Sequence, residues 1–277
     1  MRAAGYRTGM FGHYIPHAGT IGMNKPAAWD EWYALVSGGN YEYTLNVNGQ
    51  WLEYGPRGRD HFTDRLAAEA MRFMAVNRDN PFFLVYAPLA PDDPGRPPAR
   101  HANLFPEYEP PRPPNFREPD VSRKPHWVRF AKADAAPVAG SDAQQLEQWR
   151  SLQAVDEAVQ EISETVDRLG LTDNTMVLFM SDNGLQRGEH WWGSKFTSYE
   201  EAIRVPMIMR YPQRFPLPRV EGSIVLNIDV APTIAEAAGA DATAVDGESL
   251  FGSARGTGCS TRSLLDRELH ALLRQAE

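Results

Sequence analysis

The sequence has 277 residues, of which 42% are hydrophobic and 23% are charged, values that are ordinary for a globular chain with a sizeable core. Its net charge of -8 argues against nucleic acid as the main partner, because binding a polyanion needs a basic surface. A small anionic substrate stays compatible with this charge, since a few local cations or a metal can reverse the field inside a pocket. No apolar run approaches the roughly 20 residues of a membrane span. No apolar signal segment follows Met1 either, and the compartment is left open.

The first part of the chain predicts strands around one helix. Residues 5–12 form a short strand that enters a glycine turn, and the next fifty residues predict loops and short hairpin strands. Thr63 can cap a helix that runs to about Asn77. Residues 81–87 form a continuous apolar run that begins with proline. Such a run is typical of a strand buried on both faces, as in a parallel sheet.

The middle of the chain is rich in proline and then becomes helical. Residues 88–125 hold 12 of the 22 prolines, a density that excludes regular elements. We therefore predict a long surface excursion over residues 88–141, and such loops often shape a binding site. Apolar residues are then spaced by three or four from Leu146 to Leu169, and Gly170 can cap the resulting helix.

The last part of the chain alternates strands and helices. Asp229 begins a predicted helix from Val230 to Ala238. Three short apolar segments are predicted strands: residues 176–180, 205–209 and 224–228. This alternation predicts an α/β fold with a mostly parallel sheet flanked by helices.

A candidate metal site follows the strand at 176–180. In an open α/β sheet the ligand site lies beyond the carboxyl ends of the strands, and Asp182 and Asn183 are at that point. Their side-chain oxygens suit Ca²⁺ or Mg²⁺. A plain turn is the alternative, because Asp, Asn and Gly all favour turns.

A glycine-rich loop downstream adds two candidate cations, His190 and Lys195. Taken singly, each is typical of a solvated surface residue. A metal, an imidazole and an ammonium at one strand end can neutralise a sulfate or phosphate ester and stabilise its leaving oxygen. The combination favours a hydrolytic site over separate surface residues.

The order of these motifs resembles the sulfatases of the alkaline phosphatase superfamily. The segments at 4–12, 80–84 and 226–234 resemble further parts of that family, and residues 29–35 and the proline-rich loop resemble its glucosamine-6-sulfatase and heparan sulfatase branch. The central motifs are Ser181-Asp182-Asn183-Gly184, Gly188-Glu189-His190, Gly193-Ser194-Lys195 and Tyr199 to Pro206.

The resemblance implies a partial alkaline-phosphatase-like sandwich. Residues 1–250 correspond to the catalytic domain without its N-terminal strand region. Residues 251–277 form a divergent tail, with a helix over 262–275, in place of the C-terminal subdomain.

Sulfatases use a formylglycine nucleophile made within a Cys-x-Pro-x-Arg motif, which precedes an early strand, and an Asp-Asp metal pair earlier still. Neither is present in these residues. Cys259, the one cysteine, is followed by Ser-Thr-Arg and is expected to be a free cysteine in a loop. A single cysteine also excludes an internal disulfide and a multi-cysteine zinc site.

The resemblance assigns roles to the central motifs. Asp182 and Asn183 are implied metal ligands for Ca²⁺ or Mg²⁺, bound weakly because calcium prefers six to eight oxygens. Lys195 is implied to bind the sulfate and the bridging oxygen, and His190 to lie at the substrate end.

Two family positions are altered. His13 stands where the family has lysine, and imidazole is only partly protonated at neutral pH. Asp92 stands where the family commonly has a substrate-binding histidine, and an ionised Asp only accepts hydrogen bonds. Such a charge about 4 Å from a sulfate costs on the order of 4 kcal/mol at an effective dielectric of 20.

Three hypotheses remain. The chain is a sulfuric ester hydrolase acting on a sulfated small molecule or sugar, incomplete or impaired as it stands. Alternatively it is a non-catalytic relative with a weak cation or sulfated-ligand site. The third hypothesis is a phosphonate or phosphate ester hydrolase of the same superfamily.

Overall fold

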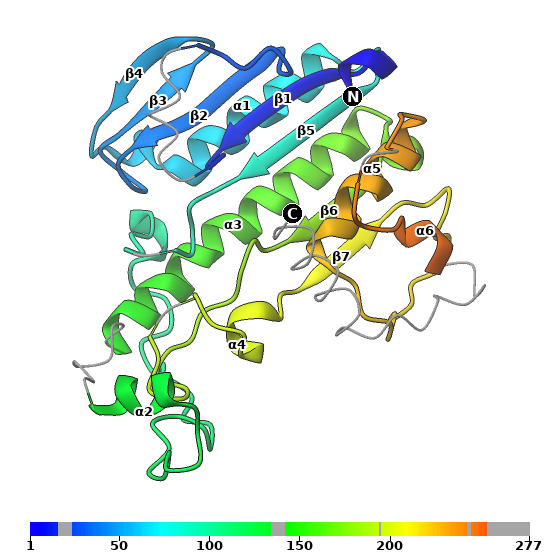
Figure 1. Cartoon of the computed structure of the whole chain (residues 1–277). Coiled ribbons are helices and arrows are strands. Elements are labelled where there is room, and N and C mark those ends of the chain that lie inside the picture. Colours follow the sequence, from blue (N-terminus) through cyan, green and yellow to red (C-terminus); the bar gives the residue numbers. More distant parts are fainter. Residues whose placement is uncertain (16–23, 93, 134–141, 194, 243–244, 254–277) are drawn as a thin grey trace. The chain divides into compact units, whose positions relative to one another are not determined.

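The computed structural model describes residues 1–15, 24–92, 94–133, 142–193, 195–242 and 245–253 (Figure 1). The chain divides into two compact units. The larger unit contains Arg7–Leu171 and Phe179–Ile208, and the smaller contains Met1–Tyr6, Thr172–Leu178 and Met209–Glu277. The predicted tail helix and Cys259 lie outside the described residues.

The larger unit is built on a five-stranded sheet in the order β4-β3-β2-β1-β5. The centre is parallel, because β1 pairs in parallel with both β2 and β5, and the antiparallel strands β3 and β4 extend it on one side. The predicted α/β class and the early strand are confirmed. The strands are β1 (Arg7–Gly12), β2 (Glu31–Ser37), β3 (Tyr43–Val47), β4 (Gln50–Tyr54) and β5 (Phe82–Ala87).

One predicted helix packs on this sheet, and a second packs against the first helix. Helix α1 (Phe62–Val76) covers one face and α3 (Asp142–Arg168) packs against α1. Thr63 lies inside α1 and does not cap it, because the helix begins at Phe62 and its N-cap residue is His61. Gly170 has the left-handed φ of 72° that a C-cap requires, as predicted. The core between α1 and the sheet consists of Phe11, Leu35, Tyr43, Leu45, Phe62, Leu66, Ala70 and Phe73.

The burial predicted for the strand at 81–87 is wrong. All six residues of β5 are half-buried. The strand is last in the order of this sheet and pairs there with β1. An edge position leaves its side chains partly accessible despite their apolar character.

The proline-rich excursion contains two elements that its composition hid, η4 (Ala99–His101) and α2 (His126–Ala133). Helix α2 starts directly after Pro125, whose carbonyl accepts the backbone N–H groups of Val128 and Arg129. Proline is compatible with a helix at its first turn, where no N–H is needed. The absence of regular elements predicted for residues 88–125 is therefore wrong at the short η4, whereas α2 follows that stretch.

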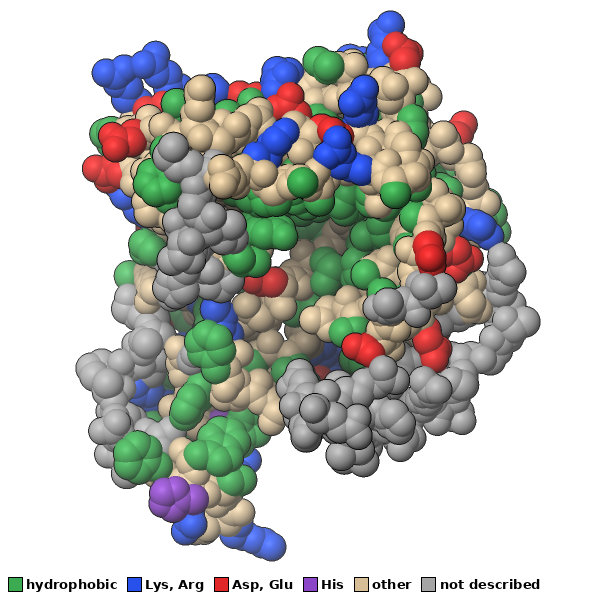
Figure 2. Space-filling view, turned by 45° about the horizontal axis from the view of Figure 1, so that its top comes forward, with side chains coloured by type: hydrophobic (Ala, Val, Ile, Leu, Met, Phe, Trp, Pro, Cys, Tyr) green, Lys and Arg blue, Asp and Glu red, His purple; other side chains and the backbone are tan. Residues whose placement is uncertain are grey.

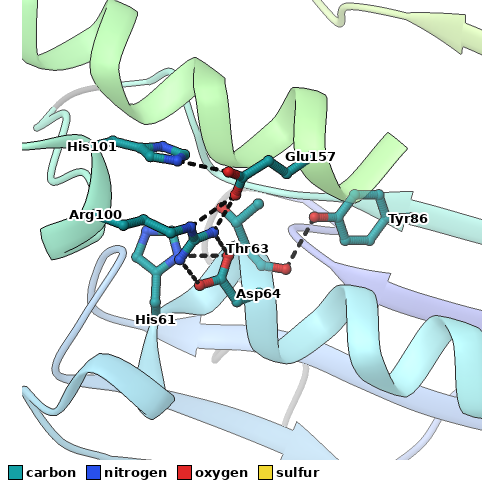
Figure 3. Close-up of polar contacts among 7 residues, drawn as sticks. All are labelled: His61, Thr63, Asp64, Tyr86, Arg100, His101 and Glu157. Carbon is teal, nitrogen blue, oxygen red and sulfur yellow. Dashed lines mark hydrogen bonds and ion pairs between the residues drawn. The ribbon is translucent and has the colours of Figure 1, made fainter. Parts of the chain in front are cut away.

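An ionic cluster ties the excursion to the helices, and we call it the Arg100 cluster (Figure 3). Arg100 in η4 binds Asp64 of α1 through two hydrogen bonds of 2.7 and 2.8 Å. Its Nη2 also lies 2.6 Å from Glu157 of α3, and His101 Nε2 lies 2.8 Å from the same carboxylate. Burial alone raises the pKa of Asp64, but the hydrogen bonds from Arg100 and the nearby His61 ring, whose Nδ1 lies 3.4 Å from the carboxylate, outweigh it and hold that pKa well below its ordinary range.

Strands β6 (Val177–Met180) and β7 (Met207–Arg210) pair with each other, which confirms two predicted strands. The smaller unit contains η1 (Arg2–Ala4), η5 (Thr172–Asn174), η6 (Asn227–Asp229), α5 (Val230–Ala238) and α6 (Leu250–Ser253).

The predicted strand at 224–228 is wrong, whereas the helix from Val230 is confirmed. The buried carboxylate of Asp229 accepts the backbone N–H groups of Leu226 and Glu248, both at 2.9 Å. A side chain therefore takes the backbone hydrogen bond that a strand would place in a ladder.

Among the described residues, no helix is long and apolar enough to cross a membrane. In the view of Figure 2, Lys and Arg side chains lie among Asp and Glu side chains and do not merge into one basic area.

Candidate functional site

Asp182 and Asn183 lie in a tight turn directly after β6, where the sequence places them. Asp182 Oδ1 accepts the backbone N–H of Asn183 at 2.9 Å, and the amide of Asn183 donates to Gly184 O at 2.9 Å. The hydroxyl of Ser181 closes the turn by donating to Asn183 O. Asp182 is exposed and Asn183 is half-buried, so the carboxylate is open to an incoming cation.

Gly184 fixes this turn against α4 (Glu200–Ile203). Its N–H donates to Ala202 O at 2.8 Å. A Cβ on Gly184 would lie 2.0 Å from Glu201 O, a distance that no side chain tolerates. This close approach explains why residue 184 is a glycine. It also holds the turn against α4.

Two side-chain oxygen donors are available to the implied metal. Asp182 and Asn183 supply one carboxylate and one amide oxygen. Within the described part of the chain, no three His, Cys, Asp or Glu side chains form a group that could hold a metal ion. Calcium takes six to eight oxygen ligands, so these two residues by themselves do not make a calcium site.

Lys195 and Asp92 are brought together by the fold. Lys195 Nζ lies 3.1 Å from Asp92 Oδ2, and the lysine side chain is 26% exposed against 51% for the aspartate. Asp92 comes from the start of the excursion after β5, and Lys195 from the loop after β6. Lys195, which was predicted to bind a sulfate anion, therefore forms an ion pair with Asp92 of the same chain.

His13 lies at the carboxyl end of β1, beside the end of β5. Its backbone N–H donates to Ala87 O at 2.8 Å, and Gly12 and Ala87 are register partners. Parallel strands end at the same edge of a sheet. His13 and the start of the excursion that carries Asp92 therefore leave the sheet at one edge.

His190 is 8% exposed and is held among polar neighbours. Its Nδ1 lies 3.1 Å from Glu118 Oε2, its Nε2 lies 3.3 Å from Asn115 Nδ2, and its ring stacks on Tyr199 at 3.8 Å. Burial alone raises the pKa of Glu118, but the hydrogen bonds from His190 and Lys124 outweigh it and lower the pKa.

Asn115, Glu118 and Glu201 are site residues that the sequence did not predict. The first two lie between prolines and look like solvated loop residues. Asn115 donates to Glu201 Oε1 at 2.6 Å, so these residues form one network around His190. The contacting residues are 72 to 86 positions apart in the sequence, and no local sequence pattern predicts such contacts.

Comparison with known proteins agrees with the motif order. A family model described as Sulfatase matches residues 1–240. N-acetylglucosamine-6-sulfatase from Homo sapiens is 32% identical over 269 residues, which cover 91% of this chain and 48% of that protein. The extracellular sulfatase SULF-1 homolog from Drosophila melanogaster is 30% identical over 247 residues, covering 85% of this chain and 22% of that protein.

A solved structure of a protein in complex with its substrate D-glucosamine-2-N,6-O-disulfate matches with a TM-score of 0.73 and 22% identity. The match covers 93% of this chain and 63% of that chain, and it shows a shared fold. The chain spans about half the length of the curated N-acetylglucosamine-6-sulfatases it matches. With the family model matching most of its residues, the chain belongs to the sulfatase family.

Proposed function

We propose that this chain carries the anion-binding side of a sulfuric ester hydrolase site, in which Lys195 binds the sulfate group. The ion pair between Lys195 and Asp92 is the observation that carries the proposal. It shows an ammonium held in a partly buried position by a carboxylate, and a substrate anion can take the place of that carboxylate. A fixed cation aimed at developing negative charge is what ester hydrolysis needs.

Asp182 and Asn183 contribute two oxygen ligands to a Ca²⁺ or Mg²⁺ site in this proposal. The exposed carboxylate of Asp182 supports this role. Since the two residues do not satisfy such an ion, further ligands are required for tight binding.

His13 supplies a second cation in the proposal when its imidazole is protonated. Its place at the carboxyl end of β1 supports this role, because ligand sites in α/β sheets lie at that edge. His190 belongs to the same site as the residue that anchors the loop leading to Lys195.

A sulfated amino sugar is the substrate class we propose. The supporting observations are the names of the relatives, N-acetylglucosamine-6-sulfatase among them, and the sulfated glucosamine bound in the matching structure.

A non-catalytic sulfated-ligand protein is the second candidate. Its supporting observation is Asp92, an acceptor-only carboxylate beside Lys195 at a position where the family commonly has a substrate-binding histidine. Asp92 offsets the charge of Lys195, which lowers the sulfate affinity expected for either candidate.

Calorimetric titration of the chain with glucosamine-6-sulfate tests the anion site. We expect saturable binding that is lost in Lys195→Met. Equal affinity for sulfated and unsulfated glucosamine would contradict the proposal. Hydrolysis, measured by release of free sulfate, separates the enzyme from the binding protein.

A further inference from the structure

The hydrogen-bond network around His190 has a direction that its partners dictate. Asn115 is the residue that sets it, because its side-chain nitrogen contacts two groups. That nitrogen lies 2.6 Å from Glu201 Oε1 and 3.3 Å from His190 Nε2. An ionised carboxylate only accepts hydrogen bonds, so the NH₂ of Asn115, and not its carbonyl oxygen, must face Glu201.

The same NH₂ group supplies the donor to the histidine ring. Since Asn115 donates toward Nε2, that ring nitrogen must be the acceptor, and the ring proton must be on Nδ1. Nδ1–H then donates to the carboxylate of Glu118, at 3.1 Å from Oε2. The ammonium of Lys124 lies 3.3 Å from Glu118 Oε1 and completes the chain of contacts.

We infer that Glu118, Asn115 and Glu201 are positioning residues that fix His190 as the neutral Nδ1–H tautomer and thereby hold the loop that carries Lys195. The importance of that loop rests on the proposed function. The tautomer itself rests on the network alone. Both ring nitrogens are used by neighbouring side chains, so His190 holds the loop and does not pass a proton to substrate.

The backbone of the loop needs this support. His190 and Trp191 have φ values of 54° and 63°, a left-handed conformation that side-chain-bearing residues rarely adopt. Such conformations persist where the surroundings over-determine them.

Residues 115–118 provide those surroundings. His190 N donates to Asn115 O and Arg117 N donates to Gly188 O, both at 2.9 Å. The indole N–H of Trp191 donates to Glu118 O at 2.8 Å. The side-chain network and these backbone bonds therefore act on the same loop.

Lys195 lies inside a loop that His190 closes. The His190 ring stacks on Tyr199 with centroids 3.8 Å apart and planes at 19°. Residues 190 and 199 flank Lys195 in sequence, so their contact joins the two ends of the segment that contains it. Loss of the ring orientation is expected to release that segment.

Nitrogen NMR of the full chain, labelled with ¹⁵N-histidine, tests the inference directly. The His190 signals are assigned by their loss in His190→Asn. At pH 7.5 we expect a protonated Nδ1 and an unprotonated Nε2. In Glu201→Gln alone, Glu118 still accepts from Nδ1, so the tautomer should persist. In Glu118→Gln combined with Glu201→Gln, neither partner is restricted to accepting, and we expect a mixture of tautomers.

Glu200→Gln is the matched control, because Glu200 precedes Glu201 on α4 and is exposed. It should leave the His190 signals unchanged. An Nε2–H tautomer or an imidazolium in the wild-type chain, or an unchanged tautomer in the double variant, would overturn the inference.

Glu118→Gln gives a second readout. We expect at least tenfold faster backbone hydrogen exchange at residues 188–193 and weaker sulfate binding, with Asp120→Asn as the exposed control. Unchanged exchange would overturn the positioning role. If the tautomer is as inferred but the wild-type chain binds no sulfate, the proposed function fails and the inference stands.

Discussion

The carboxylate of Asp92 lies 3.1 Å from the ammonium of Lys195, although 103 positions separate the two residues. The excursion after β5 thus meets the loop after β6 through opposite charges. In the family to which this chain is similar, the Asp92 position commonly holds a histidine that donates to sulfate. Here the residue accepts a hydrogen bond from the cation expected to bind the sulfate. The pair predicts a site whose affinity is limited by an internal competitor.

Removing the charge of Asp92 should strengthen anion binding. Two unit charges about 4 Å apart interact by about 1 kcal/mol in water and by about 4 kcal/mol at an effective dielectric of 20. Because Asp92 is half-exposed, we expect Asp92→Asn to raise sulfate affinity by roughly tenfold, near the lower value. Calorimetric titration with sulfate measures the change. Glu107→Gln, an exposed carboxylate on the same excursion, is the control and should have no effect.

The Arg100 cluster should stabilise the chain in a pH-dependent way. Arg100→Gln leaves Asp64 and Glu157 without their shared partner. We expect a loss of about 1–2 kcal/mol in the free energy of unfolding at pH 7, discounted because Arg100 is 44% exposed. Arg78→Gln, which breaks an exposed pair with Asp79, should cost less than about 0.5 kcal/mol.

The sign of the pH dependence follows from the carboxylates. The pKa of Asp64 is held below its ordinary value in the folded chain, so its stabilisation is present above about pH 4 and is lost as pH falls further. The difference between wild type and Arg100→Gln should therefore shrink between pH 5 and pH 2, measured by urea unfolding. A difference that grows in acid would contradict this assignment.

Gly184→Ala should destabilise the turn that carries Asp182 and Asn183. The added Cβ would meet Glu201 O at 2.0 Å, so backbone must move. We expect a cost of about 1–3 kcal/mol in thermal or urea unfolding. Gly58→Ala is the matched control, since no atom lies within 4 Å of its Cβ position. Equal stability of the two variants would show that the turn is not packed as described.

The 277-residue chain should not turn over p-nitrophenyl sulfate, with or without calcium. No Cys-x-Pro-x-Arg occurs in it, and Cys259 is followed by Ser-Thr-Arg. Calcium-dependent release of p-nitrophenol by the purified chain would contradict this prediction.

Several elements follow from local patterns in the sequence. The spacing of apolar residues locates α3 because that helix buries one stripe, and the glycine at 170 ends it with a left-handed φ. Short apolar runs locate β5, β6 and β7. The turn at Asp182 is also local in its side-chain hydrogen bonds, which lie within four residues.

Other features depend on side-chain hydrogen bonds that the spacing of apolar residues does not reveal. The segment at 224–226 is apolar, yet the carboxylate of Asp229 takes its backbone N–H and no strand forms there. The partners of His190 come from a proline-rich loop more than 70 positions away. The spacing of apolar residues indicates neither the missing strand at 224–226 nor the partners of His190, so sequence patterns could not predict them.

Sulfate titration of Asp92→Asn alone and combined with Lys195→Met tests the central claim most directly. If Lys195 is the anion-binding cation and Asp92 its competitor, the single variant binds sulfate more tightly than wild type and the double variant loses that binding. Tight sulfate binding by the double variant would show that another group holds the anion and would contradict the account.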